Sequence, residues 1–313
     1  MTLDQLRIFV AVAELEHVTR AAEALGVTQS AASTVIATLE REFDTKLFHR
    51  VGRGIVLTEG GTVLLGEARD LLARAECLAV AMSQFAGLAR GRLKIRASQT
   101  IVSHFLPASL VAFHRAHPGI TLDVSVGNSA QVVEAVVTGE VELGFIEGSE
   151  EDYQIEPLSR DLIVQDPIVM VIDTAHPLAT ATELTIGGLA ALDWIVREDG
   201  SGTRSVFFKT LQMLGVPFGD LRIAIELPSN EAVLAAVIAG AGAAVLSRSV
   251  CADALQTGSL VGLPILLAPR PFYAVQHGDR YRTRAVAAFL ATLHAHVGAG
   301  GEVDQVPTNS GGW

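Results

Sequence analysis

The sequence predicts a mixed α/β chain in three parts: a small helical head ending in a β-hairpin, one long helix, and a larger two-lobed region. Apolar residues recur at helical spacing through the first 43 residues and again from Thr58 onward. Beyond Leu93, short apolar runs alternate with amphipathic stretches, which is typical of strands that alternate with helices. A length of 313 residues accommodates two or three domains with buried cores.

Composition places the chain among globular proteins. Half of the residues are hydrophobic and 5% are aromatic. Cys77 and Cys251 lie far apart and outside any C-x-x-C motif, so no disulfide framework is expected and a reducing compartment fits. The N-terminus lacks the basic and apolar regions of a signal peptide. The longest apolar run, Ala232 to Leu246, is interrupted by glycines and is too short to span a bilayer. We therefore expect a cytoplasmic protein.

The segment from Val18 to Val35 predicts two short helices that cross at a tight turn. Gly26 lies where the first helix must stop, and glycine accepts the left-handed conformation that such a turn needs. Ala22 is small enough for a close crossing, and Thr19 and Thr28 are placed to cap the two helix starts. An apolar seam would join the helices through Ala21, Leu25, Val27, Ala32 and Val35. The arrangement is a helix-turn-helix, whose second helix enters the major groove of DNA; the alternative is an ordinary helical hairpin.

The second of these helices is expected to run from Gln29 to about Phe43 and to carry the side chains that read DNA. An amphipathic helix, with apolar residues at Leu3, Leu6, Phe9, Val10 and Ala13, would cover the pair. Glutamine can pair with adenine through two hydrogen bonds, and serine and threonine are permissive. The candidate DNA contacts here are Thr28, Gln29, Ser30, Ser33 and Thr34, some of which would touch phosphates instead.

The segment after Phe48, H-R-V-G-R-G-I-V-L-T, predicts two short strands around Gly52 and Gly54. Such a wing would carry Arg50 and Arg53 toward the DNA backbone or minor groove; the alternative is a solvated turn with two stray arginines. Residues 1–60 hold six Lys and Arg against eight Asp and Glu, and the whole chain has a net charge of −11. Because a basic domain is missing, we expect modest affinity from each head and dependence on dimerisation.

One long helix is predicted from Thr58 to about Ala89. At a rise of 1.5 Å per residue, about 30 residues span about 45 Å. A single apolar stripe follows it: Val63, Leu64, Ala68, Leu71, Leu72, Ala75, Leu78, Ala79, Met82 and Phe85. Pairing with the same helix of a second subunit would bury this stripe and place two heads on a two-fold axis, which predicts an interrupted palindrome as the DNA site. Packing of the stripe on the chain's own core is the alternative.

The region after the Gly/Arg-rich segment 87–92 predicts two α/β lobes with a cleft between them, like a periplasmic binding protein. The expected strands are 93–97, 120–126, 143–146, 169–172, 194–196, 222–226, 243–246 and 272–276. The expected helices are 104–117, 131–138, 203–214, 231–239 and 282–297. This gives a head over 1–60, a linker helix over 61–90 and a ligand-binding domain over 91–297. Lobe 1 would comprise 91–163 and 267–297, lobe 2 would comprise 164–266, and the Gly-rich tail 298–313 would be disordered.

Small and polar residues occupy four junctions where a strand ends. In open α/β sheets ligands bind at such junctions. Three of the junctions place N–H groups and hydroxyls at a helix N-terminus, which favours an anion. The sharpest is R-E-D-G-S-G-T-R, from Arg197 to Arg204, although Glu147 and Glu198 would repel an anion if they point inward. The candidate effector-binding residues are Ser98, Gln99, Thr100, Asn128, Gly148, Ser201, Gly202 and Thr203. Plain helix capping by the same residues is the alternative at any single junction.

The segments A-A-E-A-L-G-V-T-Q-S-A-A-S and L-F-H-R-V-G-R-G-I-V-L-T-E-G-G resemble the N-terminus of the LysR-type transcriptional regulators, and the match runs from Leu3 to Gly61. Gly60 and Val51 depart from the usual pattern, away from the groove-facing positions. The resemblance implies a homodimer or homotetramer that assembles through the long helix and carries a C-terminal effector sensor. Four segments of the C-terminal region resemble those of the branch of this family that governs sulfur assimilation and carbon-dioxide fixation: A-S-Q-T-I, V-G-N-S, L-G-F-I-E-G and R-E-D-G-S-G-T-R. That branch implies small oxyanions or phosphorylated metabolites as effectors.

The sequence lacks the motifs that would indicate an enzyme. No G-x-S-x-G elbow and no phosphate-binding G-x-x-x-x-G-K-S/T loop occur in the sequence. The glycines from Gly240 to Gly242 follow a helix and precede a strand, the reverse of a dinucleotide fingerprint. His114 with His117, and His294 with His296, form no ligand set. We therefore expect no enzyme activity, no cofactor and no metal. A free-standing solute-binding protein would lack the head, and a solute-binding scaffold whose helix-turn-helix no longer regulates transcription is the remaining alternative.

Overall fold

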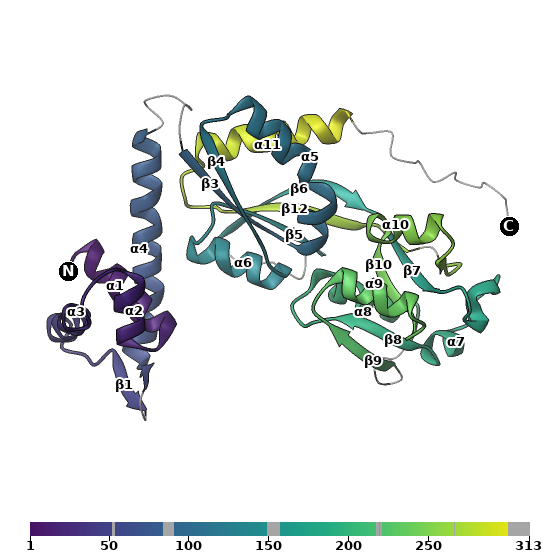
Figure 1. Cartoon of the computed structure of the whole chain (residues 1–313), viewed down its shortest axis with the longest axis horizontal. Helices are drawn as coiled ribbons and strands as arrows, with labels where there is room; N and C mark the ends of the chain where they lie inside the picture. The colour runs from purple at the N-terminus through teal and green to yellow at the C-terminus, as the bar shows by residue number, and fades with distance from the viewer. Residues whose placement is uncertain are drawn as a thin grey trace. The chain divides into compact units, whose positions relative to one another are not determined.

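A computed structural model describes residues 1–51, 54–83, 91–148, 157–216, 219, 221–265 and 267–299. Two compact units make up the chain: Met1–Gly87, and Leu88 onward apart from Thr138–Glu140. Helices and a short hairpin form the first unit, and mixed sheets with helices form the second (Figure 1). These findings confirm the predicted α/β class with a helical, winged head. In the described residues, no helix is both long and apolar enough to cross a membrane.

Three helices, a hairpin and a long helix build the first unit. The elements are α1 (Leu3–Leu15), α2 (Val18–Ala24), α3 (Gln29–Glu42), β1 (Phe48–Val51), β2 (Gly54–Leu57) and α4 (Glu59–Ser83). Apolar positions on α1 and α3 meet in a small core around Leu6, Phe9 and Leu39, which water does not reach. β1 and β2 pair antiparallel, with Arg50 opposite Ile55. The predicted wing therefore forms, although Arg53 lies outside the described residues.

The turn between α2 and α3 has the expected glycine conformation. Gly26 has a φ of +67°, and the Val27 N–H donates to the Ala22 carbonyl at 2.9 Å. Thr28 caps α3 by accepting a hydrogen bond from the Ala31 N–H at 3.2 Å. The expectation for Thr19 was wrong: α2 already begins at Val18, so His17 is its N-cap. Leu25 was also placed wrongly, because it is 42% exposed and the seam is made by smaller residues.

The apolar stripe of α4 divides into two faces. Leu64, Ala68 and Leu72 pack into the head core, as the alternative interpretation of the stripe had it. A second face, which we call the α4 stripe, stays exposed and consists of Val63, Leu71 and Leu78, at 64%, 44% and 64% exposure. The Ala79 and Met82 side chains and Phe85 fall outside the described part of the chain.

Lobe 1 of the second unit is a five-stranded sheet in the order β4-β3-β5-β12-β6. Its strands are β3 (Gly91–Ala97), β4 (Ile120–Val126), β5 (Leu143–Glu147), β6 (Leu158–Asp166) and β12 (Arg270–His277). Its helices are the π-helical turn Ile101–Phe105, α5 (Pro107–Ala116), α6 (Ser129–Thr138) and α11 (Arg284–Ala299). Side chains alternate along β5: Phe145 packs toward α5 and α11, and Ile146 packs toward α6. Helices therefore cover both faces of the sheet (Figure 1).

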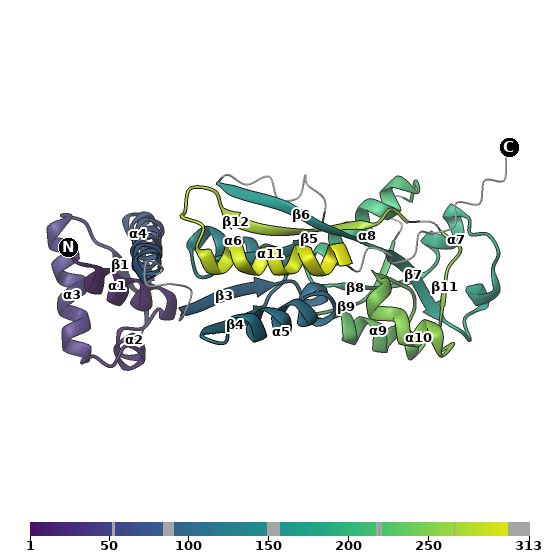
Figure 2. The ribbon, with the colours of Figure 1, turned by 90° about the horizontal axis from the view of Figure 1, so that it is seen from above.

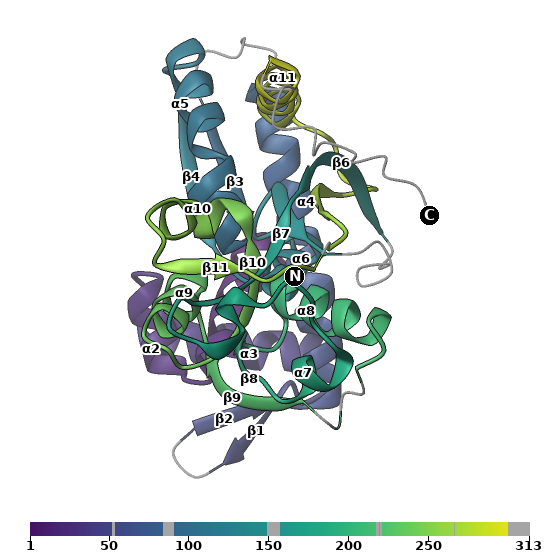
Figure 3. The same ribbon diagram turned by 90° about the vertical axis from the view of Figure 1, so that its right-hand side faces the viewer.

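Lobe 2 contains a three-stranded sheet, β10-β7-β11, and a parallel pair, β8-β9. Its strands are β7 (Ile168–Asp173), β8 (Asp193–Arg197), β9 (Arg222–Leu227), β10 (Ala244–Ser247) and β11 (Leu260–Gly262). Its helices are the 3-10 turn Pro177–Thr180, α7 (Ile186–Ala190), α8 (Gly202–Met213), α9 (Asn230–Ile238) and α10 (Arg248–Gln256). α9 and α10 pack beside β10 (Figure 3). An isolated bridge between Trp194 and Ala243 joins the two sheets.

The chain crosses between the lobes twice. The first crossing leads from β6 into β7 through Pro167, and the second leads into β12 at Arg270. β6 and β12 run side by side there (Figure 2). At the C-terminus, α11 runs to Ala299, past the predicted start of the tail at residue 298; residues 300–313 lie outside the described part of the chain.

Candidate functional site

Short polar side chains line the first turn of α3. Gln29, Ser30 and Thr34 are exposed, as is the cap residue Thr28, and Ser33 is half-buried. Gln29 Nε2 donates to Ser33 Oγ at 3.1 Å, and the Thr28 and Ser30 hydroxyl oxygens lie 3.1 Å apart. The Thr34 hydroxyl donates to the Ser30 carbonyl at 2.8 Å. These local bonds restrict the rotamers of the five side chains while leaving them at the surface.

Arg50 contributes a cation from a different element of the head. It is exposed on β1, one strand of the wing. The Ile55 N–H of β2 donates to the Glu16 carbonyl at 3.3 Å, which fastens the wing to the end of α1. A polar-tipped helix and an arginine-bearing hairpin on one small domain can bind the groove and the backbone of a duplex together.

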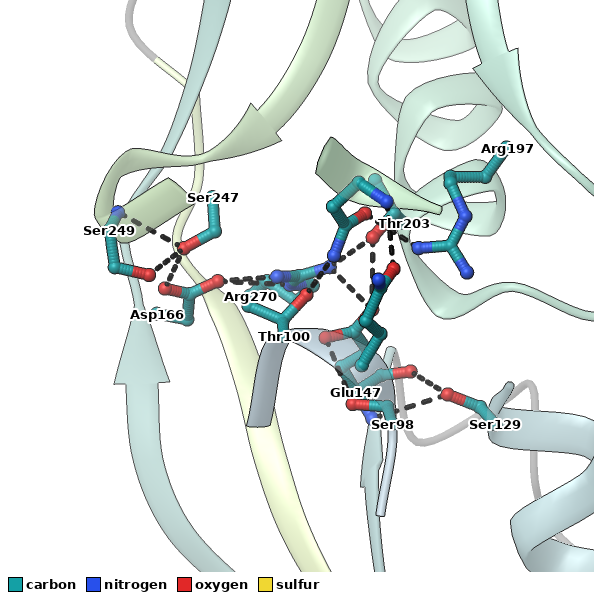
Figure 4. A network of polar contacts seen from close by, with 12 residues as sticks. Ser98, Thr100, Ser129, Glu147, Asp166, Arg197, Thr203, Ser247, Ser249 and Arg270 are labelled. Atoms are coloured by element: carbon teal, nitrogen blue, oxygen red, sulfur yellow. Dashed lines mark hydrogen bonds and ion pairs between the residues drawn. The ribbon is translucent and has the colours of Figure 1, made fainter. Parts of the chain in front are cut away.

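In the second unit, the carboxylate of Glu147 points inward, to the place where the sequence predicted a bound anion. The carboxylate at the end of β5 is 2% exposed and reaches the N-terminus of α8 across the lobes (Figure 4). Ser98 Oγ donates to Glu147 Oε2 at 3.2 Å, and Thr203 Oγ1 donates to Glu147 Oε1 at 2.9 Å. The Gly202 position is so close that a Cβ there would lie 2.0 Å from the Glu147 carbonyl oxygen. Because the start of α8 carries a partial positive charge, a carboxylate there is stabilised.

Arg270 completes the surroundings of Glu147. Its side chain is fully buried, and its Nη1 lies 3.0 Å from Glu147 Oε1 and 2.8 Å from Thr203 Oγ1. Its Nη2 lies 2.6 Å from Asp166 Oδ2, and Ser247 donates to Asp166 Oδ1 at 2.7 Å. One guanidinium therefore connects two buried carboxylates and a threonine (Figure 4).

A second set of contacts joins Gln99 and Thr100 of lobe 1 to α9 of lobe 2. Gln99 Oε1 accepts from the Asn230 N–H at 2.7 Å, and the Gln99 amide donates to Glu231. Asn230 Nδ2 donates to Thr100 Oγ1 at 2.8 Å, and Asn230 Oδ1 accepts from Arg197 at 2.6 Å. The bonds from Gln99 and Thr100 join lobe 1 directly to the start of α9 in lobe 2.

A third set involves Asn128, which caps α6. Asn128 Oδ1 accepts from the Gln131 N–H at 3.0 Å, and Asn128 Nδ2 donates to the Asp199 carbonyl of lobe 2 at 3.2 Å. The Ala130 N–H donates to the Gly200 carbonyl at 3.3 Å. The loop before α8 therefore supplies acceptors to the start of α6.

The structure brings most of the predicted effector residues to one interlobe cluster, with their polar groups paired within the protein. Ser98, Thr203 and Gly202 surround Glu147, whereas Gln99, Thr100 and Asn128 bond lobe 2 directly. Gly148 follows Glu147, and its N–H donates to the Pro271 carbonyl at 3.3 Å. Ser201 is buried as the N-cap of α8 and makes no side-chain capping bond. Ser149, in the same predicted junction as Gly148, lies outside the described residues.

The arginines flanking the α8 loop serve other carboxylates. Arg197 pairs with Glu198 at 2.7 Å, so Glu198 is neutralised by its neighbour. Arg204 donates to the Arg197 carbonyl and pairs with Glu226. Sequence reasoning missed Asp166, Asn230, Ser247 and Arg270. Two of these had a usable signal, because Asp166 and Arg270 are charged residues at the ends of apolar runs.

Burial shifts two ionisable groups in this region. Burial raises the pKa of Asp166 above its ordinary 3.8, and the charge of Arg270 opposes that effect. Burial, with the Asp166 charge added, raises the pKa of Cys251 to about 12, so its thiol stays protonated and is a poor nucleophile. In the described residues, no group of three or more His, Cys, Asp or Glu side chains is arranged to hold a metal ion.

Both parts of the chain match established family models. Residues 3–62 match the bacterial regulatory helix-turn-helix protein, lysR family, and residues 86–298 match the LysR substrate binding domain. YeiE, an HTH-type transcriptional regulator of Escherichia coli strain K12, is 35% identical over 93% of this chain and 96% of its own length. CysL of Bacillus subtilis is 34% identical over 80% and 82% of the two chains. CbbR of Rhodospirillum rubrum is 34% identical over 94% and 96%.

Solved structures share the fold. The regulatory domain of Synechocystis CcmR in complex with 2-PG has a TM-score of 0.59 and 28% identity, over 66% of this chain and 97% of that one. Full-length CbnR bound to its target DNA has a TM-score of 0.66 and 20% identity, over 94% and 99% of the two chains. A winged head with an exposed polar helix start, a two-lobed second unit and family matches that together span nearly all of the sequence lead to one conclusion: the chain belongs to the LysR family of bacterial transcriptional regulators.

Proposed function

We propose that this LysR-type regulator senses a small anion in the cleft of its second unit, and that the anion tunes operator binding by paired heads. The regulator acts on DNA in the bacterial cytoplasm and not as an enzyme. The single observation that carries the effector class is the position of Glu147. Two hydroxyls, a buried guanidinium and a helix N-terminus surround its carboxylate. Groups of this kind stabilise negative charge, so they would suit an external anion once the inward-pointing Glu147 carboxylate, which would otherwise repel it, has moved away from them.

An external anion would take the place of the Glu147 carboxylate. Ser98 and Thr203 would then donate to the new oxygens, and Asn128, Thr100 and Ser201 would lie beside the anion when the lobes close around it. The structure of the CcmR regulatory domain with 2-PG supports a small ligand in a domain of this fold. The resemblance to the branch that governs sulfur assimilation and carbon-dioxide fixation makes oxyanions and phosphorylated metabolites the compounds to try first.

Paired heads would come from the α4 stripe. Its three exposed apolar side chains lie at helical spacing along one face, and burying them against a second copy of α4 is favourable. Two heads related by a two-fold axis would read an interrupted palindrome, with Gln29, Ser30 and Ser33 toward base edges and Arg50 toward phosphates. The structure of CbnR with its target DNA supports duplex DNA as the partner of this type of head.

Isothermal titration calorimetry of the full chain with sulfate, sulfite, phosphate and a phosphosugar tests the effector class. We expect at least one of these anions to bind, and the absence of heat with all of them would refute an anion-sensing cleft. DNase footprinting on the protein's own upstream region, with and without the binding anion, tests the regulatory part. An unchanged footprint would favour a scaffold that binds solute without regulating transcription.

A further inference from the structure

Asp166 and Arg270 lie at the two places where the chain crosses between the lobes. Asp166 is the last residue of β6, Arg270 is the first of β12, and the antiparallel register places them opposite each other. Arg270 Nη2 and Nε lie 2.6 and 3.1 Å from Asp166 Oδ2. This ion pair fastens the two crossing strands, β6 and β12, which run side by side in Figure 2, to each other.

The same two side chains reach both lobes. Ser247 of lobe 2 donates to Asp166 Oδ1 at 2.7 Å. Arg270 Nη1 contacts Thr203 of lobe 2 and Glu147 of lobe 1 (Figure 4). The Arg270 guanidinium therefore contacts the crossing strand β6 and both lobes. Because of these contacts, the charges of the carboxylates that it pairs with affect the free energy of lobe closure.

Two carboxylates share this guanidinium in a site that is nearly closed to water. Glu147, Asp166 and Arg270 are 2%, 6% and 1% exposed. The ionisable groups that face Asp166 in the described part of the chain are Arg270 of β12, Glu147 of β5 and Cys251 of α10, whose thiol is neutral. α8 and β10 contribute the hydroxyls of Thr203 and Ser247. With both carboxylates ionised, the cluster carries a net charge of −1, and an uncompensated buried charge is costly.

We propose that the Glu147–Arg270–Asp166 cluster is a proton-linked latch: Asp166 binds a proton while the lobes are closed and releases it when they open. Protonation at Oδ1 leaves one carboxylate, Glu147, paired with one guanidinium, and the protonated Asp166 still accepts from Arg270 through Oδ2 while losing the bond that Ser247 donates to Oδ1. Opening separates Thr203 from Glu147 and admits water, which solvates the ionised Asp166. The proposal rests on the proposed function in one respect, since it takes lobe closure as the motion that an effector controls.

The sign of the pH dependence follows from the raised pKa of Asp166, which burial causes and the charge of Glu147 increases. In the closed state the carboxyl keeps its proton above the ordinary value of 3.8, whereas in the open state it is ionised there. Closure is therefore favoured at low pH and weakens as the pH rises toward the closed-state value. Above that value Asp166 is ionised in both states, so the free energy of closure no longer changes with pH.

Hydrogen–deuterium exchange of the effector-free full chain, followed by mass spectrometry, tests the latch. Exchange would be measured from about pH 4 to about pH 8 and corrected for the intrinsic pH dependence of the chemical step. We expect the protection of peptides covering β5 and the start of α8 to fall as the pH rises, by at most about tenfold per pH unit. Asp166→Asn, which cannot ionise, should remove this slope. Asp161→Asn, on the exposed face of the same strand, should keep it.

Protection that does not change with pH in the wild type, or an unchanged slope in Asp166→Asn, would overturn the latch. Should Asp166→Asn fail to fold by circular dichroism, Ser247→Ala provides a second variant. It removes a hydroxyl that stabilises the ionised carboxylate, so the transition should move to higher pH, and a transition that stays in place would contradict the proposal. Since no anion is added, this readout is independent of whether the cleft binds an effector.

Discussion

Gly202 and Glu147 belong to different lobes, yet a Cβ at Gly202 would lie only 2.0 Å from the Glu147 carbonyl oxygen. The start of α8 therefore reaches β5 only because residue 202 has no side chain. Any side chain at residue 202 would meet the β5 backbone before the lobes reached this separation.

Replacing Gly202 by alanine should keep the lobes apart. A backbone atom cannot yield as the end of a side chain can, so we expect closure to cost about 1–3 kcal/mol more and anion affinity to fall accordingly. Calorimetry with the anion that binds the wild type measures the loss. Gly187→Ala, on α7 of the same lobe, places its Cβ in open space and should bind like the wild type. Equal affinities in the two variants would show that the contact does not limit closure.

Thr203 joins Glu147 to Arg270 through one hydroxyl, and its replacement by valine keeps the shape while removing both bonds. Leaving buried partners unsatisfied costs about 1–3 kcal/mol, so the anion affinity should fall by about tenfold or more. Operator affinity in a gel-shift assay without anion should be unchanged. Thr210→Val, two turns further along α8, is the matched control. If the Thr203→Val protein binds the anion as tightly as the wild type does, Thr203 is not part of the anion site.

Arg50 and Gln29 should contribute to DNA binding in different ways. Arg50→Ala removes a phosphate contact, so binding should weaken similarly on all sequences and the salt slope should drop by about 1. Gln29→Ala removes a base contact and should cost about 1–3 kcal/mol on the operator alone. Fluorescence anisotropy at several salt concentrations, on operator and random duplexes, separates the two effects. Arg7→Ala, on α1, is the control, and a loss of specificity in Arg50→Ala would reverse the assignment.

Leu71 lies in the middle of the α4 stripe, and a glutamate there would place two charges in a symmetric helix pair. Burying an unpaired charge is unfavourable by about 2 kcal/mol or more, so Leu71→Glu should shift the protein toward monomers. Sedimentation velocity measures the shift, and weaker operator binding should accompany it. Leu162→Glu, at an exposed leucine of β6, should leave the assembly unchanged. A Leu71→Glu protein that still forms dimers would place the interface elsewhere.

Local patterns predicted the head well because its signals are short-range. Gly26 and the Thr28 cap act within one turn of chain, and both lie where the sequence indicated. Thr19 was misplaced because a one-residue shift in the start of α2 moves the cap to His17. Leu25 was misplaced because the buried contact between α2 and α3 is made by alanines such as Ala21 and Ala32. The strand β6 and the helix α10 were missed, since β6 alternates polar residues through its exposed face and α10 contains few large apolar residues.

The interlobe cluster could be predicted only in part. Junction residues such as Ser98 and Thr203 precede or begin helices, so their neighbourhood follows from strand order. Arg270 and Asp166 are 104 positions apart, and their pairing depends on the register between β6 and β12, which no local pattern reveals. The inward orientation of Glu147 likewise depends on the close approach at Gly202. Long-range packing, and not local propensity, decides these contacts.

The strand order of lobe 1 has a consequence for synthesis on the ribosome. β12, which is made nearly last, lies between β5 and β6 and not at an edge of the sheet. Lobe 2 is formed by one continuous stretch of sequence and can complete its core earlier. In the nascent lobe 1, by contrast, the edges of β5 and β6 that pair with β12 stay unpaired until β12 is made. Chains terminated before Arg270 would lose an interior strand and should aggregate, whereas termination after α11 should be harmless.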